Sequence, residues 1–237
     1  MDGTITQSNE LIYASFNCVA EKYLHKQFTP LEITRMFGPT EEKVIEMLVG
    51  KEHFDEARNV FWNFYREQHN ALSSLYDGVI ELLEFLSANN ILVAMFTGKG
   101  KVSVGISLEL FDIKKYFDII ITGHDVTKSK PSGEGIQIIL DALSLAPEET
   151  LMVGDAISDI KAAEETGVPC AVALWDSYAK EEIELLNPSL KFYSVQKFTQ
   201  WIEEIVLKQT IRHPELVSGT LVESKEMLKQ VQHDEYK

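Results

Sequence analysis

Asp155 and Asp159 stand four residues apart in the segment Gly154-Asp155-Ala156-Ile157-Ser158-Asp159, and this spacing suggests a cation site. Carboxylates at positions i and i+4 can address one cation together, and the glycine lets the chain turn sharply off the apolar run before it. Hard oxygen ligands suit Mg²⁺, which normally keeps several waters and a substrate phosphate among its ligands. The same segment is also compatible with a helix start that Asp155 caps.

Three other polar segments contain residue types that handle phosphate groups. Asp2-Gly3-Thr4 supplies a carboxyl group, Thr97 supplies a hydroxyl after an apolar run, and Lys130 supplies an ammonium group held by Pro131. Such groups can stabilise the charge of a phosphoryl group in a transition state. Taken alone, each has a simpler explanation: a turn, a helix cap and a solvated surface lysine.

The sequence from about residue 76 onward alternates between apolar runs and helical patterns. The predicted helices are 79–88, 102–111, 134–144 and 158–166, and the apolar runs are 91–96, 117–121, 151–153 and 168–174. Nearly all-apolar strands that alternate with helices of this length indicate a parallel sheet covered on both faces. Such sheets place their chemistry at the carboxyl ends of the strands, where Thr97, Lys130 and Asp155 follow the apolar runs.

Residues 9–75 contain no convincing strand and are predicted to form an all-helical insert. Apolar residues recur there at helical spacing, and Thr40 is a candidate cap for a helix whose first turn contains Glu41 and Glu42. The α/β core would then comprise residues 1–8 and 76–207. Residues 208–237 are polar and add no strand, so they are either an appended segment or an ordinary terminal helix.

Composition limits the partners and the location. The net charge of −15 repels nucleic-acid backbones and anionic membranes, so a bound phosphate must be held locally by metal, lysine or backbone N–H groups. The sequence has no apolar run long enough to span a bilayer and no secretory signal, which predicts a cytoplasmic protein. Cys18 and Cys170 have no CxxC pairing and are expected to be separate reduced thiols.

These segments together resemble the haloacid dehalogenase-like hydrolase superfamily, in the branch of phosphoglycolate phosphatase-like enzymes with a helical cap. The family pattern is an apolar strand with Asp-x-Asp-Gly-Thr, a strand ending in Thr or Ser, a Lys-Pro loop and Gly-Asp-x-x-x-Asp. The resemblance covers roughly residues 2–207. It implies a doubly wound, Rossmann-like parallel sheet with an inserted all-helical cap. Ser132-Gly133 departs from the commoner form of the family, in which a second proline is frequent.

The resemblance also implies roles for individual residues. Asp2 would be the general acid/base, Thr97 would contact phosphoryl oxygens, and Lys130 would offset charge between nucleophile and phosphate. The implied magnesium ligands are the backbone carbonyl of Asp2 and the carboxylates of Asp155 and Asp159. The candidate substrate-binding residues are Gly3, Thr97, Gly98 and Lys130 in the core, and Arg35 and Thr40 in the cap.

The first motif is truncated in this sequence. The family nucleophile lies two residues before the acid/base aspartate, which is the position immediately before Met1, and Met1 would be the variable residue of Asp-x-Asp. The strand that carries the nucleophile is expected in the middle of the sheet, between the strands that end in Thr97 and Asp155. A chain that truly began at Met1 would lack the attacking group, and we expect it to fold poorly.

The resulting functional prediction is a Mg²⁺-dependent phosphatase that acts on a small phosphorylated metabolite, either phosphoglycolate-like or a sugar phosphate. The helical cap would exclude water and select the substrate. A sugar phosphomutase on the same scaffold and a non-catalytic binding relic are the alternatives. No nucleic-acid or membrane partner is expected, and either a monomer or a homodimer is compatible with the sequence.

Overall fold

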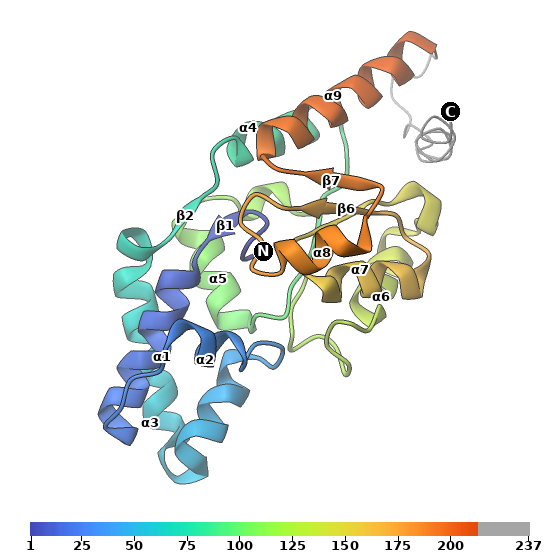
Figure 1. The fold of residues 1–237 in the computed structure, drawn as a ribbon. Helices are drawn as coiled ribbons and strands as arrows, with labels where there is room; N and C mark the ends of the chain where they lie inside the picture. Colours follow the sequence, from blue (N-terminus) through green and yellow to red (C-terminus); the bar gives the residue numbers. More distant parts are fainter. Residues whose placement is uncertain (213–237) are drawn as a thin grey trace.

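The computed structural model describes the backbone of residues 1–212 and the side chains of residues 1–206, and the predicted tail at 208–237 lies almost entirely outside the described residues. The chain alternates between strands and helices after an N-terminal helical segment (Figure 1). In chain order the elements are β1 (Thr6–Gln7), α1 (Asn9–Leu24), α2 (Pro30–Thr34), α3 (Glu41–Leu72), β2 (Ser74–Leu75), α4 (Val79–Ala88), β3 (Ala94–Phe96), α5 (Lys101–Leu110), β4 (Ile119–Ile121), α6 (Glu134–Leu143), β5 (Met152–Gly154), α7 (Ile157–Thr166), β6 (Cys170–Ala173), α8 (Lys180–Leu186), β7 (Leu190–Phe192) and α9 (Val195–Arg212).

The strands of the core pair in parallel, as predicted. β3 pairs with β4, and β5, β6 and β7 follow one another in a second ladder. Within the described residues no ladder joins β3 to β5, which is the position expected for a strand that precedes Asp2. That strand stays a prediction. The α/β fold class with parallel strands and helical cover is confirmed, whereas β7, α8 and α9 do not follow from the sequence pattern.

Helices cover both faces of these strands because successive strand residues point to opposite sides. Met95 packs in a cluster with residues of α4, α5 and α9, among them Leu83 and Val104. Its neighbour Phe96 packs in another cluster with residues of α6 and α7, among them Ile139. The two-layer cover explains why the strands read as almost continuous apolar runs in the sequence.

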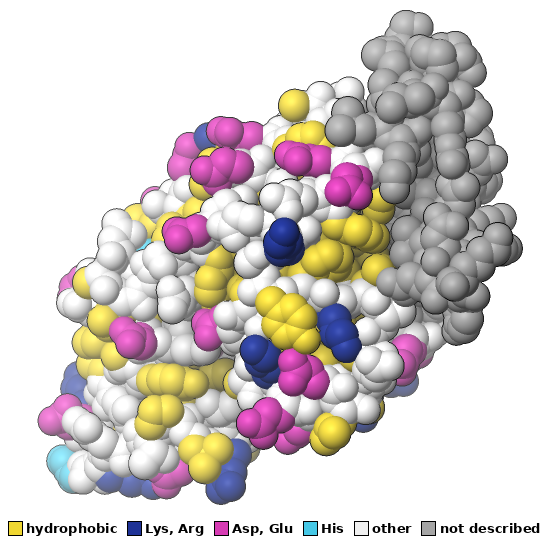
Figure 2. All heavy atoms as spheres, turned by 45° about the horizontal axis from the view of Figure 1, so that its top comes forward, with side chains coloured by type: hydrophobic (Ala, Val, Ile, Leu, Met, Phe, Trp, Pro, Cys, Tyr) yellow, Lys and Arg dark blue, Asp and Glu magenta, His cyan; other side chains and the backbone are white. Residues whose placement is uncertain are grey.

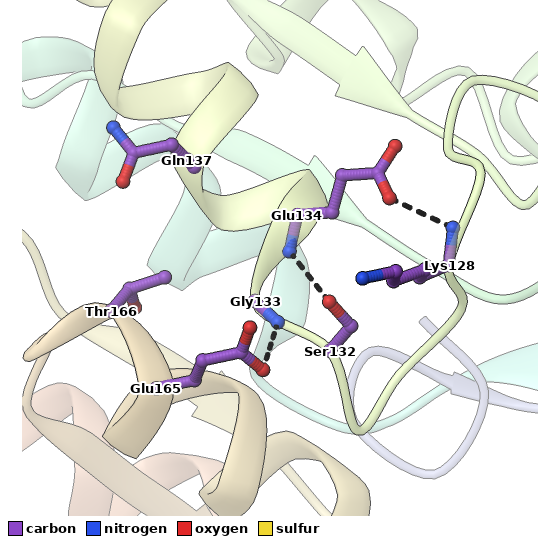
Figure 3. Close-up of a pocket in the computed structure, with 7 residues that line it drawn as sticks. All are labelled: Lys128, Ser132, Gly133, Glu134, Gln137, Glu165 and Thr166. Carbon is purple, nitrogen blue, oxygen red and sulfur yellow. Dashed lines mark hydrogen bonds between the residues drawn. The ribbon is translucent and has the colours of Figure 1, made fainter.

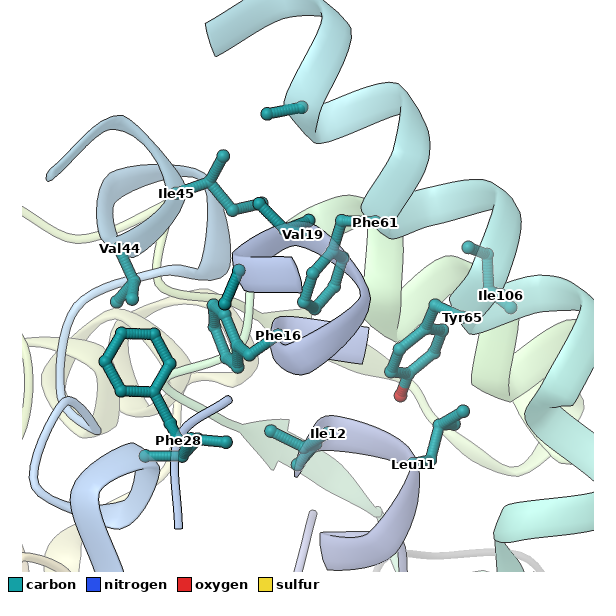
Figure 4. Close-up of a cluster of buried hydrophobic side chains, with 13 residues drawn as sticks. Leu11, Ile12, Phe16, Val19, Phe28, Val44, Ile45, Phe61, Tyr65 and Ile106 are labelled. Atoms are coloured by element: carbon teal, nitrogen blue, oxygen red, sulfur yellow. The ribbon is translucent and has the colours of Figure 1, made fainter. Parts of the chain in front are cut away.

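The helices α1, α2 and α3 form their own hydrophobic core, which Figure 4 shows in close-up. Phe61 and Tyr65 of α3 are fully buried against α1, where Leu11 is also inaccessible to solvent. Ile106 of α5 joins this cluster from the core side. The helix α3 bends at Gly50, whose φ of +74° is outside the helical range, so it continues in a new direction. The predicted all-helical insert is therefore a unit with its own hydrophobic core, and it packs against α5.

Two short antiparallel strands connect this unit to the rest of the chain. Thr6 of β1 faces Leu75 of β2, and Gln7 faces Ser74. The chain enters α1 directly after β1 and leaves α3 directly before β2. Both crossings between the helical unit and the parallel strands therefore lie side by side.

Acidic side chains are spread over the face drawn in Figure 2 and do not gather in one place, in keeping with the net charge of −15. No helix in the described part of the chain combines the length and apolar character required to cross a bilayer.

Two glycines, in helices on opposite faces of the strands, allow a matched test of the packing. A Cβ atom at Gly135 would lie 2.3 Å from the ring of Phe96, whereas a Cβ atom at Gly105 would meet nothing within 4 Å. We expect Gly135→Ala to lower the free energy of unfolding by ~1 to 3 kcal/mol, because the overlap forces Phe96 to shift. Gly105→Ala should raise it by ~0.5 to 1 kcal/mol, because alanine has the higher helix propensity. Urea denaturation measures both, and equal effects of the two variants would contradict the packing described here.

Candidate active site

Residues from distant parts of the sequence meet where the parallel strands end. Thr4 Oγ1 donates to Asp155 Oδ1 at 2.8 Å, across 151 positions of sequence. Lys130 Nζ donates to Asp159 Oδ1 at 2.6 Å and lies 3.5 Å from the carbonyl oxygen of Phe96, which directly precedes Thr97. The structure therefore brings the Asp2-Gly3-Thr4, Thr97, Lys130 and Asp155–Asp159 segments to one place, as parallel strands should.

The turn at the start of the chain is shaped by Gly3. Its φ is +73°, and a Cβ atom there would lie 2.2 Å from Asp155 Oδ2, so only glycine fits this approach. The carbonyl oxygen of Met1 accepts hydrogen bonds from the backbone N–H of Ile5 at 2.8 Å and of Thr6 at 3.1 Å. Trp175 Nε1 donates to the carbonyl oxygen of Thr4 at 3.2 Å. The turn is therefore held in place both by Asp155, which accepts from the Thr4 hydroxyl, and by Trp175, which donates to the Thr4 carbonyl oxygen.

Asp159 is fixed by the beginning of α7. Its Oδ2 accepts from the backbone N–H groups of Asp155 and Ala156, both at 3.1 Å, while its Oδ1 accepts from Lys130. Asp155 is buried with only one side-chain donor, Thr4, among the described residues. Burial and the nearby Asp159 carboxylate raise the pKa of Asp155 to about 6. The pair therefore concentrates negative charge that the described protein groups neutralise only in part.

Thr97 is buried at the end of β3, where its backbone N–H donates to the carbonyl oxygen of Ile121 at 3.0 Å. Its hydroxyl oxygen accepts from the backbone N–H of Lys99 at 3.3 Å. Threonine side chains commonly form such local hydrogen bonds with backbone N–H groups two residues further along, so this contact corresponds to the simpler, capping role of Thr97. Gly98 follows in the same turn, and the loop that precedes α3 lies beside it: a Cβ atom at Gly98 would be at an ordinary van der Waals distance, 3.7 Å, from the carbonyl oxygen of Gly38.

The carboxylate of Asp2 is anchored through one oxygen. Asp2 Oδ1 accepts from Lys99 Nζ at 3.1 Å, from Thr6 Oγ1 at 3.2 Å and from the hydroxyl of Ser8. Burial is the largest single effect and would raise the pKa of Asp2, but Lys99, the terminal ammonium group of Met1 and the hydroxyl of Ser8 together hold that pKa below its ordinary value. Lys99 was not among the predicted site residues. Its place directly after Thr97-Gly98 at a strand end was the signal that could have found it.

The cap also brings to this region a residue that was not predicted, Glu41. Arg35 is exposed at the end of α2, whereas Thr40 lies beside Gly123, where a Cβ atom would be 2.8 Å from Thr40 Cγ2. Glu41 is buried, and its Oε2 accepts from the backbone N–H of Gly100 at 2.7 Å. The sequence analysis identified Glu41 only as a residue in the first turn of a helix. Its burial comes from the contact between α3 and the start of α5, and a contact between elements so far apart in the sequence leaves no local pattern.

The donor set at Asp155 fits a hard divalent cation. Asp155 is a buried carboxylate beside a second carboxylate, and the close approach of Gly3 places the first turn of the chain against it. In the part of the chain that the structure describes, no three His, Cys, Asp or Glu side chains are grouped to hold a metal ion. The predicted set remains a prediction, since it combines two carboxylates with the backbone carbonyl of Asp2.

A polar pocket of about 310 Å³ lies between the beginning of α6 and the end of α7 (Figure 3). Its polar groups largely bond to one another: the backbone N–H of Lys128 donates to Glu134, and that of Gly133 donates to Glu165. The pocket adjoins the Lys130 loop but does not include Asp2, Asp155 or Asp159. It is therefore distinct from the strand-end cluster.

A parallel sheet under a helical cap, with aspartates, a threonine and a lysine gathered at its strand ends, defines a class of capped α/β hydrolases. Residues 1–173 match the family model of the haloacid dehalogenase-like hydrolases, and the chain belongs to this family. It is 30% identical over 183 residues to the pyrophosphatase PpaX of Bacillus pumilus, a match that spans 77% of this chain and 84% of that protein. A pyrophosphatase PpaX from Anoxybacillus flavithermus is also 30% identical, over 79% of this chain and 87% of its own length. These matches confirm the predicted family and the predicted enzyme class, a hydrolase of phosphoric esters.

Solved structures show the same fold at lower identity. A hydrolase from Pseudomonas syringae superposes with a TM-score of 0.69 at 21% identity, covering 86% of this chain and 95% of that one. A haloacid dehalogenase-like family hydrolase from Streptococcus pneumoniae gives a TM-score of 0.66 at 20% identity, covering 85% and 95%. These likenesses support the capped α/β fold.

The concentrated charge at Asp155 predicts that its removal stabilises the metal-free protein. The raised pKa of about 6 means that the folded state loses stability as Asp155 ionises between about pH 4 and 6. In a chelator at pH 7.5, Asp155→Asn should raise the free energy of unfolding by ~1 to 3 kcal/mol, and the gain should shrink as the pH falls toward 4. Urea denaturation over this pH range measures the gain. Asp141→Asn, on the exposed side of α6, is the control and should have little effect; a destabilised Asp155→Asn protein would contradict the charge argument.

Proposed function

We propose that this protein is a Mg²⁺-dependent phosphatase that hydrolyses a small phosphorylated metabolite through an aspartyl-phosphate. The observation that carries the proposal is the meeting of the Asp2 turn with Asp155, made through the 2.8 Å hydrogen bond from Thr4. It joins the predicted acid/base segment to the predicted metal segment. The pyrophosphatase names of the PpaX relatives and the structure of CbbY from Rhodobacter sphaeroides, solved in complex with phosphate, support a phosphate-handling site.

The proposed mechanism gives each residue a task at a particular atom. Lys130 Nζ, 2.6 Å from Asp159 Oδ1, offsets the negative charge that accumulates when a phosphoryl group enters. The Thr97 hydroxyl and the backbone N–H groups around Gly98 stabilise phosphoryl oxygens in the transition state. Asp155, Asp159 and the Asp2 carbonyl would hold Mg²⁺, which supplies charge neutralisation and orientation of the phosphate when bound.

Asp2 is proposed to transfer the proton. All the hydrogen bonds and ion pairs found for its carboxylate within the described residues fall on Oδ1, which leaves Oδ2 to protonate a leaving oxygen and later to activate water. This mechanism requires an attacking carboxylate two residues before Asp2, which we propose to lie in frame upstream of Met1. The function is therefore tested on a chain that carries the residues encoded in frame upstream of Met1.

The proposal also covers the substrate of the enzyme and its location in the cell. The loop that leads to α3 lies beside Gly98 and Gly123, which follow β3 and β4, so the helical unit would exclude water from a small substrate. Phosphoglycolate-like compounds, sugar phosphates and, from the PpaX relatives, inorganic pyrophosphate are the substrates to compare. We place the enzyme in the cytoplasm and expect neither nucleic acid nor membrane as a partner.

Hydrolysis by the N-terminally extended protein is expected to require Mg²⁺ and Asp2. With p-nitrophenyl phosphate as the first substrate, Asp2→Asn should lower kcat by ~10²- to 10⁴-fold, because the proton transfer is lost. Excess chelator should abolish turnover, and added Mg²⁺ should restore it. Phosphate release measures the rate, and the exposed variant Asp141→Asn serves as the matched control.

Two experimental outcomes would contradict the proposed phosphatase function. Turnover that is unchanged in Asp2→Asn would show that the strand-end cluster is not the catalytic site. Transfer of phosphate between positions of a sugar, dependent on a bisphosphate, would identify a phosphomutase, whereas net release of phosphate without a bisphosphate excludes it.

A further inference from the structure

Lys99 is a buried ammonium group at the junction of the core and the cap. Its side chain is only 6% exposed. Lys99 Nζ donates to Asp2 Oδ1 at 3.1 Å and to the hydroxyl of Tyr65 at 3.0 Å, and it lies 4.0 Å from Glu41 Oε1. Asp2 belongs to the core, whereas Tyr65 and Glu41 both belong to α3 of the cap. One cation is therefore shared between the proposed acid/base group and the helical cap.

Both cap partners of Lys99 are fixed by the helix α5, which begins two residues after it. Glu41 accepts from the backbone N–H of Gly100 at 2.7 Å and from the hydroxyl of Ser103 at 2.6 Å. The Tyr65 hydroxyl lies 3.1 Å from the hydroxyl of Ser107, one turn further along the helix. The contacts of α3 with Lys99 and with α5 thus form one network that holds the cap in its present place.

The energetics of this network favour the position that the cap holds in this structure. A buried ammonium group is stable only when its charge is paired and its N–H groups are satisfied. If α3 moved away, Lys99 would lose the Tyr65 hydroxyl and the Glu41 carboxylate together, and Glu41 would lose its two donors. Because Asp2 would then be the only carboxylate left at Lys99 Nζ among the described residues, any shift of Lys99 would be transmitted to Asp2.

We propose that Lys99 is a positioning residue through which closure of the helical cap sets the placement of the Asp2 carboxylate. The inference rests on the proposed function, in which Asp2 transfers the proton. Lys99 binds Oδ1 and thereby orients Oδ2 toward the reacting oxygen, and Tyr65 and Glu41 hold Lys99 in that place only while the cap is closed. The position of the cap would then determine the position of the Asp2 carboxylate, so the cap would do more than exclude water from the site.

The structural part is tested by hydrogen–deuterium exchange, which requires no activity. Tyr65→Phe removes only the hydroxyl, and Lys99→Gln removes the charge. In both variants of the extended chain, exchange in the segments 1–8 and 38–45 should rise about fivefold, because the cap and the Asp2 turn loosen together. Lys101→Gln, two residues along at a side chain that is 61% exposed, is the matched control and should leave both segments unchanged. Faster exchange confined to the cap would overturn the proposed link to Asp2.

The catalytic part is tested by a double-mutant cycle with steady-state kinetics. Lys99→Gln should lower kcat by ~10- to 100-fold with little change in KM, because a misplaced acid/base group impairs chemistry and leaves binding intact. In the Asp2→Asn background the same substitution should have almost no further effect, since both changes remove one function. A purely structural role would give multiplicative losses, and that result would overturn the proposal.

Tyr65→Phe keeps the test decisive if Lys99→Gln folds poorly. It should lower kcat by ~3- to 10-fold, again only when Asp2 is present. A chain that shows the predicted exchange but no activity that depends on Asp2 would refute the proposed phosphatase mechanism and leave the coupling of cap and Asp2 turn intact. Normal exchange at 1–8 together with Asp2-dependent activity would refute the coupling alone.

Discussion

The burial of negative charge at the strand ends is the constraint on which the rest of this structure depends. Asp155 and Asp159 are buried together, and Glu41 is buried nearby on the cap side. In water such charges would be solvated, but in a protein interior each must be paired or hydrogen-bonded. Lys130 meets Asp159, and Lys99 meets Asp2 and Glu41. The loops after β3 and β4 are therefore positioned by ion pairs as well as by packing.

The helices and strands from α4 to β6 could be predicted because their signals are local, whereas the short strands β1 and β2 were not predicted. The predicted helix 79–88 coincides with α4, and the predicted helix 134–144 differs from α6 by one residue at its end. Apolar runs between turn residues identify strands that are covered on both sides. By the same rule, the polar residues that follow the runs could be assigned to one site from their order in the sequence. The strand β7 was missed because Lys191 stands in its centre and interrupts the apolar pattern.

The residues that join the cap to the core could not be predicted in this way. Glu41 and Arg35 look alike as charged residues near a helix end, yet Glu41 is buried and Arg35 is exposed. The difference arises because α3 packs against α5, which places Glu41 at the free N–H groups of that helix. Burial raises the pKa of Glu41, although Lys99 and hydrogen bonds, among them those from Ser103 and Gly100, oppose this effect. Such a position depends on long-range packing, which the spacing of residues in the sequence does not encode.

The chain path gives this packing a second connection to Asp2. The cap is reached through β1 and left through β2, and Thr6 of β1 also donates to Asp2 Oδ1 at 3.2 Å. Any rotation of the cap about these two crossings therefore acts on the Asp2 turn directly through the backbone, and also through Lys99. Two independent connections that converge on one carboxylate oxygen restrict its position more than either could alone. Because Oδ1 is restricted in this way, the orientation of Oδ2 becomes a property of the whole capped structure.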